Sequence, residues 1–123
     1  MQQPAPHVNL VITTGEPAGV GPEVSIAAAK QFLLEHANAS ITLLGDQDLL
    51  KEVILDPNTD RLQVEAIPLI ASSTPGKLNV QNGPYVIQLL DKAIDGCMAG
   101  QFDAMVTAPI QKSVINQAGL AFT

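Results

Sequence analysis

The sequence predicts an α/β fold in which helices cover a parallel β-sheet. Short apolar runs rich in β-branched residues alternate along the chain with longer segments of helix-forming residues, and this alternation is typical of parallel sheets. The 123 residues are 46% hydrophobic and 15% charged, which provides enough apolar material for a core.

The first expected strand and the first expected helix flank a glycine-rich loop. Residues 8–14 (VNLVITT) are nearly all apolar, as expected for a strand covered on both faces, and Gly15 ends the run. Residues 22–36 (PEVSIAAAKQFLLEH) are rich in helix formers, and Pro22 suits the first helical position because that position needs no N–H donor. Apolar residues almost encircle this segment, so we expect a well-buried helix.

The middle of the chain repeats the pattern. Residues 40–46 (SITLLGD) predict a second strand, and residues 47–56 (QDLLKEVILD) predict a short amphipathic helix that ends before a proline. Residues 61–69 (RLQVEAIPL) alternate between apolar and polar side chains, which favours a half-exposed strand near a sheet edge. Residues 71–79 (ASSTPGKLN) have the composition of a loop.

The last third of the chain predicts a helix, a strand and another short helix. Between residues 82 and 100 a stripe of apolar side chains recurs at helical spacing: Val86, Leu89, Leu90, Ala93, Ile94 and Cys97. Because Cys97 lies on this stripe, we expect a small buried core residue rather than a nucleophile. Residues 102–110 (FDAMVTAPI) predict a strand, and residues 111–119 (QKSVINQAG) predict a helix capped by Gly119.

The composition excludes several classes of function. A net charge of -6 argues against broad contact with nucleic acid or an anionic membrane. The single cysteine cannot form an internal disulfide, and residues 1–7 resemble a flexible arm rather than a secretory leader. No apolar run approaches the roughly 20 residues of a spanning helix. We therefore expect a soluble cytoplasmic protein.

The glycine-rich loop is the first candidate site, because ligands of open parallel sheets bind beyond the carboxyl ends of the strands. Its Gly-x-x-x-Gly-x-Gly spacing, from Gly15 through Gly19 to Gly21, matches neither the dinucleotide fingerprint nor the P-loop. Glu16 and Glu23 disfavour a bare phosphate site. The loop either lets a ligand approach the backbone, with Glu16 accepting hydrogen bonds, or is a plain strand-to-helix turn.

The second candidate loop follows the last expected strand, at the same sheet edge. It contains a hydroxyl at Thr107 and a cation at Lys112. Lys112 could bind a phosphate or carboxylate, or take part in proton transfer if buried; the alternative is a solvated surface lysine, with Thr107 merely ending the strand. The two histidines, His7 and His36, have no partner at ligand spacing, so no metal site can be assembled from this chain alone.

Two separated segments carry a family resemblance. Residues 12–23 (ITTGEPAGVGPE) and residues 82–123 (beginning NGPYVIQLL and containing VTAPIQK) resemble consecutive blocks of the 4-hydroxythreonine-4-phosphate dehydrogenases. That family implies the three-layer, parallel-sheet fold of isocitrate and isopropylmalate dehydrogenases, incomplete in this chain. It also implies an NAD-dependent and divalent-metal-dependent (Zn, Mg or Co) oxidation of 4-phosphohydroxy-L-threonine. The 3-oxo acid then loses carbon dioxide to give 3-amino-2-oxopropyl phosphate, in pyridoxal 5'-phosphate (vitamin B6) biosynthesis.

The resemblance also implies roles for individual residues. Gly15, Glu16, Gly19 and Gly21 fall in the motif beside the cofactor cleft. In the second motif, where the family also shows Gly in place of Ala108, Thr107 is expected to contact substrate and Lys112 to be catalytic.

The resemblance finally sets limits on what this chain does alone. The family's metal ligands lie outside this chain, and its active site forms at a homodimer interface. Residues 8–123 are therefore expected to be the N-terminal part of a dehydrogenase, inactive alone. Two alternatives stay open: a dehydrogenase of 4-phospho-D-threonate or 4-phospho-D-erythronate, or a non-enzymatic α/β binding module.

Overall fold

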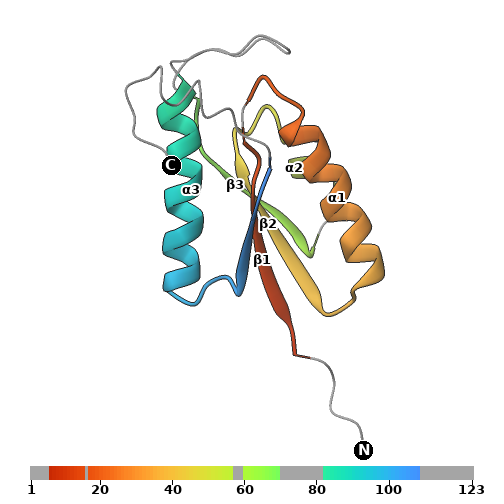
Figure 1. Cartoon of the computed structure of the whole chain (residues 1–123). Helices are drawn as coiled ribbons and strands as arrows, with labels where there is room; N and C mark the ends of the chain where they lie inside the picture. Colours follow the sequence, from red (N-terminus) through yellow and green to blue (C-terminus); the bar gives the residue numbers. More distant parts are fainter. Residues whose placement is uncertain (1–5, 16, 57–59, 70–81, 109–123) are drawn as a thin grey trace, which may run out of the picture.

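The computed structural model describes residues 6–15, 17–56, 60–69 and 82–108, in which four parallel strands form one sheet (Figure 1). In chain order the elements are β1 (Val8–Thr13), α1 (Gly21–Glu35), β2 (Ala39–Gly45), α2 (Lys51–Ile54), β3 (Leu62–Ala66), α3 (Gly83–Met98) and β4 (Ala104–Thr107). The predicted α/β class and the parallel sheet are confirmed. The expected helix at residues 111–119, its Gly119 cap and the expected loop at residues 71–79 lie outside the described residues.

The strands lie in the order β3-β2-β1-β4, so β1 is an interior strand. Its alternating side chains enter two different cores, because successive residues of a strand point to opposite faces. Ile12 packs in the cluster beneath α1 and α2, whereas Val11 packs in the cluster beneath α3. The nearly continuous apolar run of this strand is explained by this burial on both faces.

Helices α1 and α2 cover one face of the sheet, and α3 covers the other (Figure 1). The chain runs from β1 through α1 to β2 and through α2 to β3, and then crosses by α3 to β4 on the far side of β1. The direction of winding therefore reverses between β1 and β4. Within the described residues no helix is long and apolar enough to cross a membrane.

Helix α1 corrects one expectation. It begins at Gly21, with Pro22 in the first turn as predicted, but it is not buried all round. Its sheet-facing residues are buried, whereas Val24 is 51% exposed and Leu34 is 83% exposed. The expectation of a well-buried helix was wrong because the sheet covers only one face of α1, and apolar residues on the other face remain in solvent.

Helix α3 shows a rotated apolar stripe. Its buried residues are Gly83, Tyr85, Val86, Leu89, Ala93 and Gly96. Of the predicted stripe, Ile94 is 47% exposed, and Cys97 is half-buried at the margin of the cluster. The expectation that Cys97 is a small buried core residue was therefore only partly correct. Tyr85, which is not part of the predicted stripe, is fully buried in the cluster between α3 and the sheet.

Strand β3 and helix α2 are of the types that their sequence patterns predict. Strand β3 lies at one end of the strand order, as its alternation predicts. Helix α2 is a single turn, much shorter than the predicted segment, and Val53 is its buried residue.

Candidate functional site at the carboxyl ends of the strands

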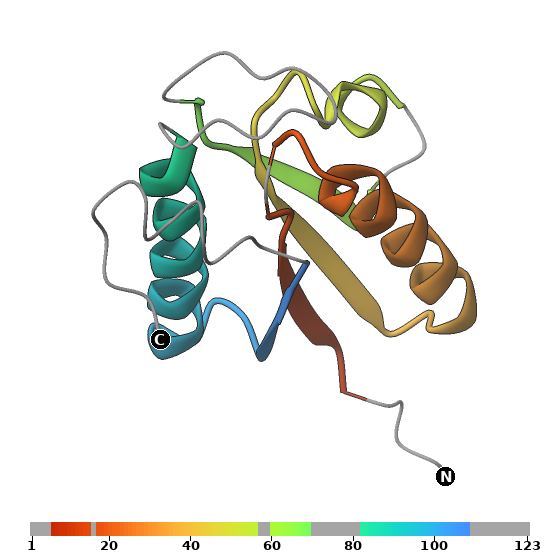
Figure 2. The same cartoon turned by 45° about the horizontal axis from the view of Figure 1, so that its top comes forward.

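The candidate site lies where the winding of the sheet reverses. All strands are parallel, so their carboxyl ends share one edge, and β1 and β4 are neighbours across the reversal. Open α/β sheets bind ligands in the crevice at this topological position. Figure 2, with this edge turned forward, shows the connection from β1 to α1 rising beside the end of β4.

The glycine loop from β1 to α1 is shaped by backbone requirements at two of its glycines. Gly15 has φ of 76°, in the left-handed region that glycine enters without steric cost. A Cβ on Gly21 would collide with the backbone carbonyl oxygen of Thr14. Both glycines are therefore needed to let α1 start directly above the end of β1, whereas Gly19 is exposed to solvent.

The end of β4 contacts this loop directly. The backbone N–H of Ala108 donates a hydrogen bond to the Thr13 carbonyl oxygen at 2.9 Å. A Cβ built on Gly21 would lie 3.4 Å from the Cβ of Ala108. Thr107 pairs with Thr13 in the parallel register and is exposed. The structure thus brings Gly15, Gly21 and Thr107 to one edge, as the parallel pattern predicts. Glu16 and Lys112 lie outside the described residues.

A layer of buried polar groups supports the same edge. The Tyr85 hydroxyl accepts a hydrogen bond from the Asp46 backbone N–H at 2.9 Å. The Thr14 hydroxyl donates to the Leu44 carbonyl oxygen at 2.9 Å. Gly45 lies between them, since a Cβ there would meet both the Thr14 and the Tyr85 hydroxyls. These side-chain contacts fix the loops after β1 and β2 relative to α3.

Two buried hydroxyls at or near this edge have no hydrogen-bond partner among the described residues. They are Thr13 Oγ1 and Ser25 Oγ, on side chains that are 1% and 3% exposed. Buried polar groups in native proteins are nearly always hydrogen-bonded to protein or water.

Sequence reasoning missed the polar layer. Thr14, Asp46 and Tyr85 were not candidates, although each leaves a signal in the sequence. Thr14 and Asp46 are the first polar groups beyond buried strand residues, and Tyr85 is a polar-tipped aromatic residue in the first turn of an otherwise apolar helix stripe. Polar residues that directly follow apolar strands therefore indicate the edge at which parallel sheets bind ligands.

The two histidines lie in structural contacts away from this edge. His7 Nε2 is 2.7 Å from Ser40 Oγ, and the His36 ring stacks on Phe32 with ring centroids 4.2 Å apart. Among the described residues no group of three or more His, Cys, Asp or Glu side chains could hold a metal ion. The described residues therefore do not fit a metal centre, and we derive no metal-dependent step from them.

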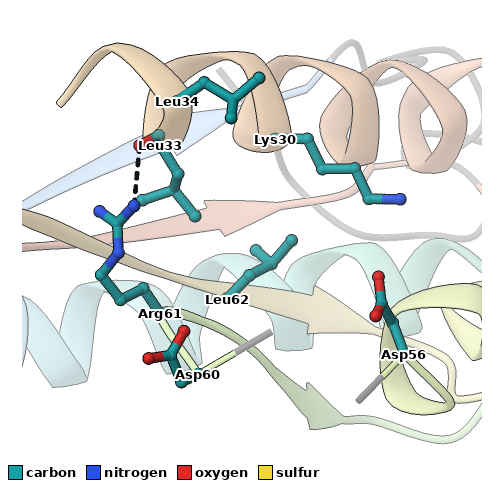
Figure 3. Close-up of a pocket in the computed structure, with 7 residues that line it drawn as sticks. All are labelled: Lys30, Leu33, Leu34, Asp56, Asp60, Arg61 and Leu62. Atoms are coloured by element: carbon teal, nitrogen blue, oxygen red, sulfur yellow. Dashed lines mark hydrogen bonds between the residues drawn. The ribbon is translucent and has the colours of Figure 1, made fainter. Parts of the chain in front are cut away.

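A separate pocket of about 320 Å³ lies at the opposite edge of the sheet, between the end of α1 and the start of β3 (Figure 3). Its main polar feature is Arg61, whose guanidinium donates to the carbonyl oxygens of Leu33, His36 and Ala39 at 2.9 to 3.0 Å. The bonds to Leu33 and His36 satisfy carbonyls at the C-terminus of α1, and the bond to Ala39 reaches the first residue of β2. The arginine is thus explained by helix capping, and the pocket is remote from the carboxyl edge.

Fold and site together define an open, parallel α/β protein whose strand order reverses between β1 and β4. The family model described as "Pyridoxal phosphate biosynthetic protein PdxA" matches residues 21–123. The chain therefore belongs to the PdxA family.

Curated relatives agree with this assignment. The 4-hydroxythreonine-4-phosphate dehydrogenase of Burkholderia vietnamiensis is 45% identical over 97% of this chain and 38% of its own length. That of a Janthinobacterium strain is 44% identical over 93% of this chain and 39% of its own. This chain thus spans well under half the length of either relative.

The solved structures agree on the fold. The crystal structure of a 4-hydroxythreonine-4-phosphate dehydrogenase from Burkholderia phymatum superposes with a TM-score of 0.76 at 22% identity, covering 93% of this chain and 40% of that one. At this sequence identity the structural similarity supports the fold alone, and that fold agrees with the parallel sheet described above.

Proposed function

We propose that residues 1–123 form the N-terminal part of a 4-hydroxythreonine-4-phosphate dehydrogenase. In this proposal the whole protein oxidises 4-phosphohydroxy-L-threonine with NAD in vitamin B6 biosynthesis. The observation that carries the proposal is the 45% identity to the Burkholderia vietnamiensis dehydrogenase over 97% of this chain. The fold supports it, because Thr107 and Ala108 at the end of β4 lie beside Thr13 and Gly21 at the reversal of the sheet.

The described residues would build one wall of the reaction crevice. The exposed Gly19 lets the cofactor approach the loop backbone, and Thr107 presents a hydroxyl to the phosphorylated substrate from the end of β4. When bound, NAD would supply the hydride acceptor and a divalent metal would supply a Lewis acid; the residues that would hold the metal lie outside this chain. Decarboxylation of the resulting 3-oxo acid then gives 3-amino-2-oxopropyl phosphate.

The remaining parts of the proposal concern Lys112 and the assembly. Lys112 follows β4 by five positions in the sequence and is the cation of this loop. We assign it to substrate binding or proton transfer, since a lysine beside a phosphorylated acid stabilises negative charge. The whole protein would work as a cytoplasmic homodimer, and residues 1–123 alone would be inactive.

The direct test assays the full-length protein with 4-phosphohydroxy-L-threonine, NAD and a divalent metal. Formation of NADH supports the proposal, and its absence in a folded protein overturns it. Parallel assays with 4-phospho-D-threonate and 4-phospho-D-erythronate decide whether a related phosphorylated hydroxy acid is the better substrate. In each assay, omission of the metal tests the metal requirement.

A chimera isolates the contribution of this chain. In the chimera, residues 1–123 precede the part of the Burkholderia vietnamiensis enzyme that follows its matched segment. Gly19→Val in the chimera is expected to raise the KM for NAD, because a branched side chain blocks the approach to the loop backbone. Lys112→Ala is expected to reduce kcat/KM at least tenfold with little change in melting temperature. Unchanged kinetics would indicate that Lys112 is a solvated surface lysine without a role in substrate binding or proton transfer.

A further inference from the structure

Thr13 carries a buried hydroxyl without a partner at the carboxyl edge of the sheet. Its side chain is 1% exposed, and its Oγ1 atom forms no hydrogen bond within the described part of the chain. The hydroxyls of Thr14 and Tyr85 at the same edge are both hydrogen-bonded, to the Leu44 carbonyl oxygen and to the Asp46 N–H. Because a buried polar group without a partner is costly, we expect the Thr13 hydroxyl to gain one in the working protein.

Thr107 carries the adjacent hydroxyl on the neighbouring strand. Thr13 and Thr107 are register partners on β1 and β4, and the side chains of such partners stand on the same face of the sheet. This face lies beneath α3, because Val11 and Met105, two positions earlier in each strand, pack in the cluster beneath α3. The hydrogen bond from the Ala108 N–H to the Thr13 carbonyl oxygen, at 2.9 Å, fixes the two strand ends in this register.

The two threonines differ in their access to a ligand. Thr107 is exposed, whereas Thr13 is not, so only the Thr107 hydroxyl can contact a substrate directly. Hydroxyls of threonines that face each other across two strands are able to form a hydrogen bond with each other. Rotation of the exposed Thr107 side chain would therefore supply the partner that Thr13 lacks.

We propose that Thr13 is a positioning residue, whose hydroxyl donates a hydrogen bond to Thr107 Oγ1 when the substrate binds. The phosphate and carboxylate oxygens of the substrate only accept hydrogen bonds, so Thr107 contacts either of them as a donor. With Thr13 donating to its oxygen, Thr107 directs its own proton to the anionic oxygen, and each hydrogen bond strengthens the other. This inference rests on the proposed function, in which Thr107 contacts the substrate.

The test measures NADH formation by the full-length protein over a range of 4-phosphohydroxy-L-threonine concentrations. Thr13→Val keeps the shape of the side chain and removes its hydroxyl. It should raise the KM for the substrate about threefold to tenfold, the effect of one hydrogen bond, with little change in kcat. The melting temperature should not fall, because the hydroxyl has no partner in the free protein. Thr13→Ser restores the hydroxyl and should restore the KM; Thr13→Ala decides the test if Thr13→Val does not fold.

Thr42→Val is the matched control. Thr42 is the register partner of Val11 on β2 and therefore shares the face of Thr13, two positions further from the carboxyl edge. The same substitution at this position should leave the KM unchanged.

A double substitution tests whether Thr13 acts through Thr107. Thr107→Val alone should raise the KM, and Thr13→Val should have no further effect in that background. Inhibition by 4-hydroxy-L-threonine, which lacks the phosphate, identifies the contacted group. Thr13→Val should weaken this inhibition if Thr107 contacts the carboxylate and leave it unchanged if Thr107 contacts the phosphate.

Three results would overturn this inference while leaving the proposed function in place: a KM raised by Thr107→Val but not by Thr13→Val, effects of the two substitutions that add, or a lower melting temperature of Thr13→Val with an unchanged KM, which would assign the hydroxyl a purely structural role. Absence of NADH formation by the folded, unsubstituted protein would overturn the proposed function and this inference with it.

Discussion

At the residue scale, Gly21 is the position where the fold tolerates no side chain. A Cβ there would meet the Thr14 carbonyl oxygen, which belongs to the backbone and cannot move away by changing rotamer. We expect Gly21→Ala to lower the unfolding free energy of the chimera by about 3 kcal/mol, at the upper end of overpacking costs. Denaturant titration measures it.

Gly100→Ala is the control for this substitution. Gly100 has φ of 80° but open space around its Cβ position, so the change should cost only about 1 kcal/mol of left-handed strain. Equal losses at the two sites would show that the carbonyl contact is unimportant.

Tyr85 connects α3 to the loop after β2 through one hydroxyl. Tyr85→Phe keeps the buried ring but leaves the Asp46 N–H without the acceptor now 2.9 Å away. An unsatisfied buried donor costs about 1–3 kcal/mol, so the chimera should lose stability by that amount. Thermal melting checks it, with Tyr85→Leu as the comparison that removes the ring as well. A melting temperature unchanged by Tyr85→Phe would contradict the assigned role of the hydroxyl.

Individual residues differ in how well the sequence predicts them. Pro22 and Gly15 were predictable because their roles are local: one starts a helix, and the other ends a strand run. The bond between Tyr85 and Asp46 spans 39 positions and exists only once the sheet has formed. No local pattern contains such a partner, so the bond itself could not be predicted, although Asp46 and Tyr85 each leave a signal in the sequence.

At the scale of elements, the C-terminus of α1 is capped by Arg61, the residue directly before β3. Arg61 donates to three carbonyl oxygens, including Leu33 O at 2.9 Å (Figure 3). Arg61→Ala should therefore destabilise the chimera by about 1–3 kcal/mol and speed exchange of the His36 amide, which now bonds to Phe32 O. Lys92→Ala removes a surface ion pair worth at most about 1 kcal/mol and is the matched control.

If Arg61→Ala and Lys92→Ala have the same effect on stability and on the His36 amide, Arg61 does not cap α1.

Elements were predictable in type but not in burial. The β-branched runs of β1 and β2 and the alternation of β3 identify strands because those patterns match burial on two faces or one. Helix α1 was misjudged because its apolar residues include Val24 and Leu34, which the four described strands leave uncovered. An apolar pattern shows which side chains of a helix could be buried. Which of them are buried depends on how much of the helix the sheet covers.

At the scale of the whole molecule, the sequence predicts that the ends of β1 and β4 share an edge of the sheet but not that these two strands are neighbours. Any parallel sheet would place the ends of β1 and β4 on one side. Their direct contact requires the order β3-β2-β1-β4, which follows from the crossover through α3 to the far side of β1. Hydrophobic periodicity does not determine on which side of β1 the strand after α3 is placed.

The same strand order leads to the last prediction, which concerns residues 1–123 as an isolated chain. Val106 on the edge strand β4 and Val24 on α1 are each about half exposed, so the isolated chain should bind a hydrophobic dye already at low temperature and melt over a broad range. The chimera should bind little dye before a cooperative transition, because the added part of the Burkholderia vietnamiensis enzyme is expected to cover these two side chains. Val106→Lys should lower dye binding by the isolated chain more than Met98→Lys does, although Met98 is the more exposed residue at 84%. A sharp melt of the isolated chain with little dye binding would instead favour a self-sufficient α/β binding module.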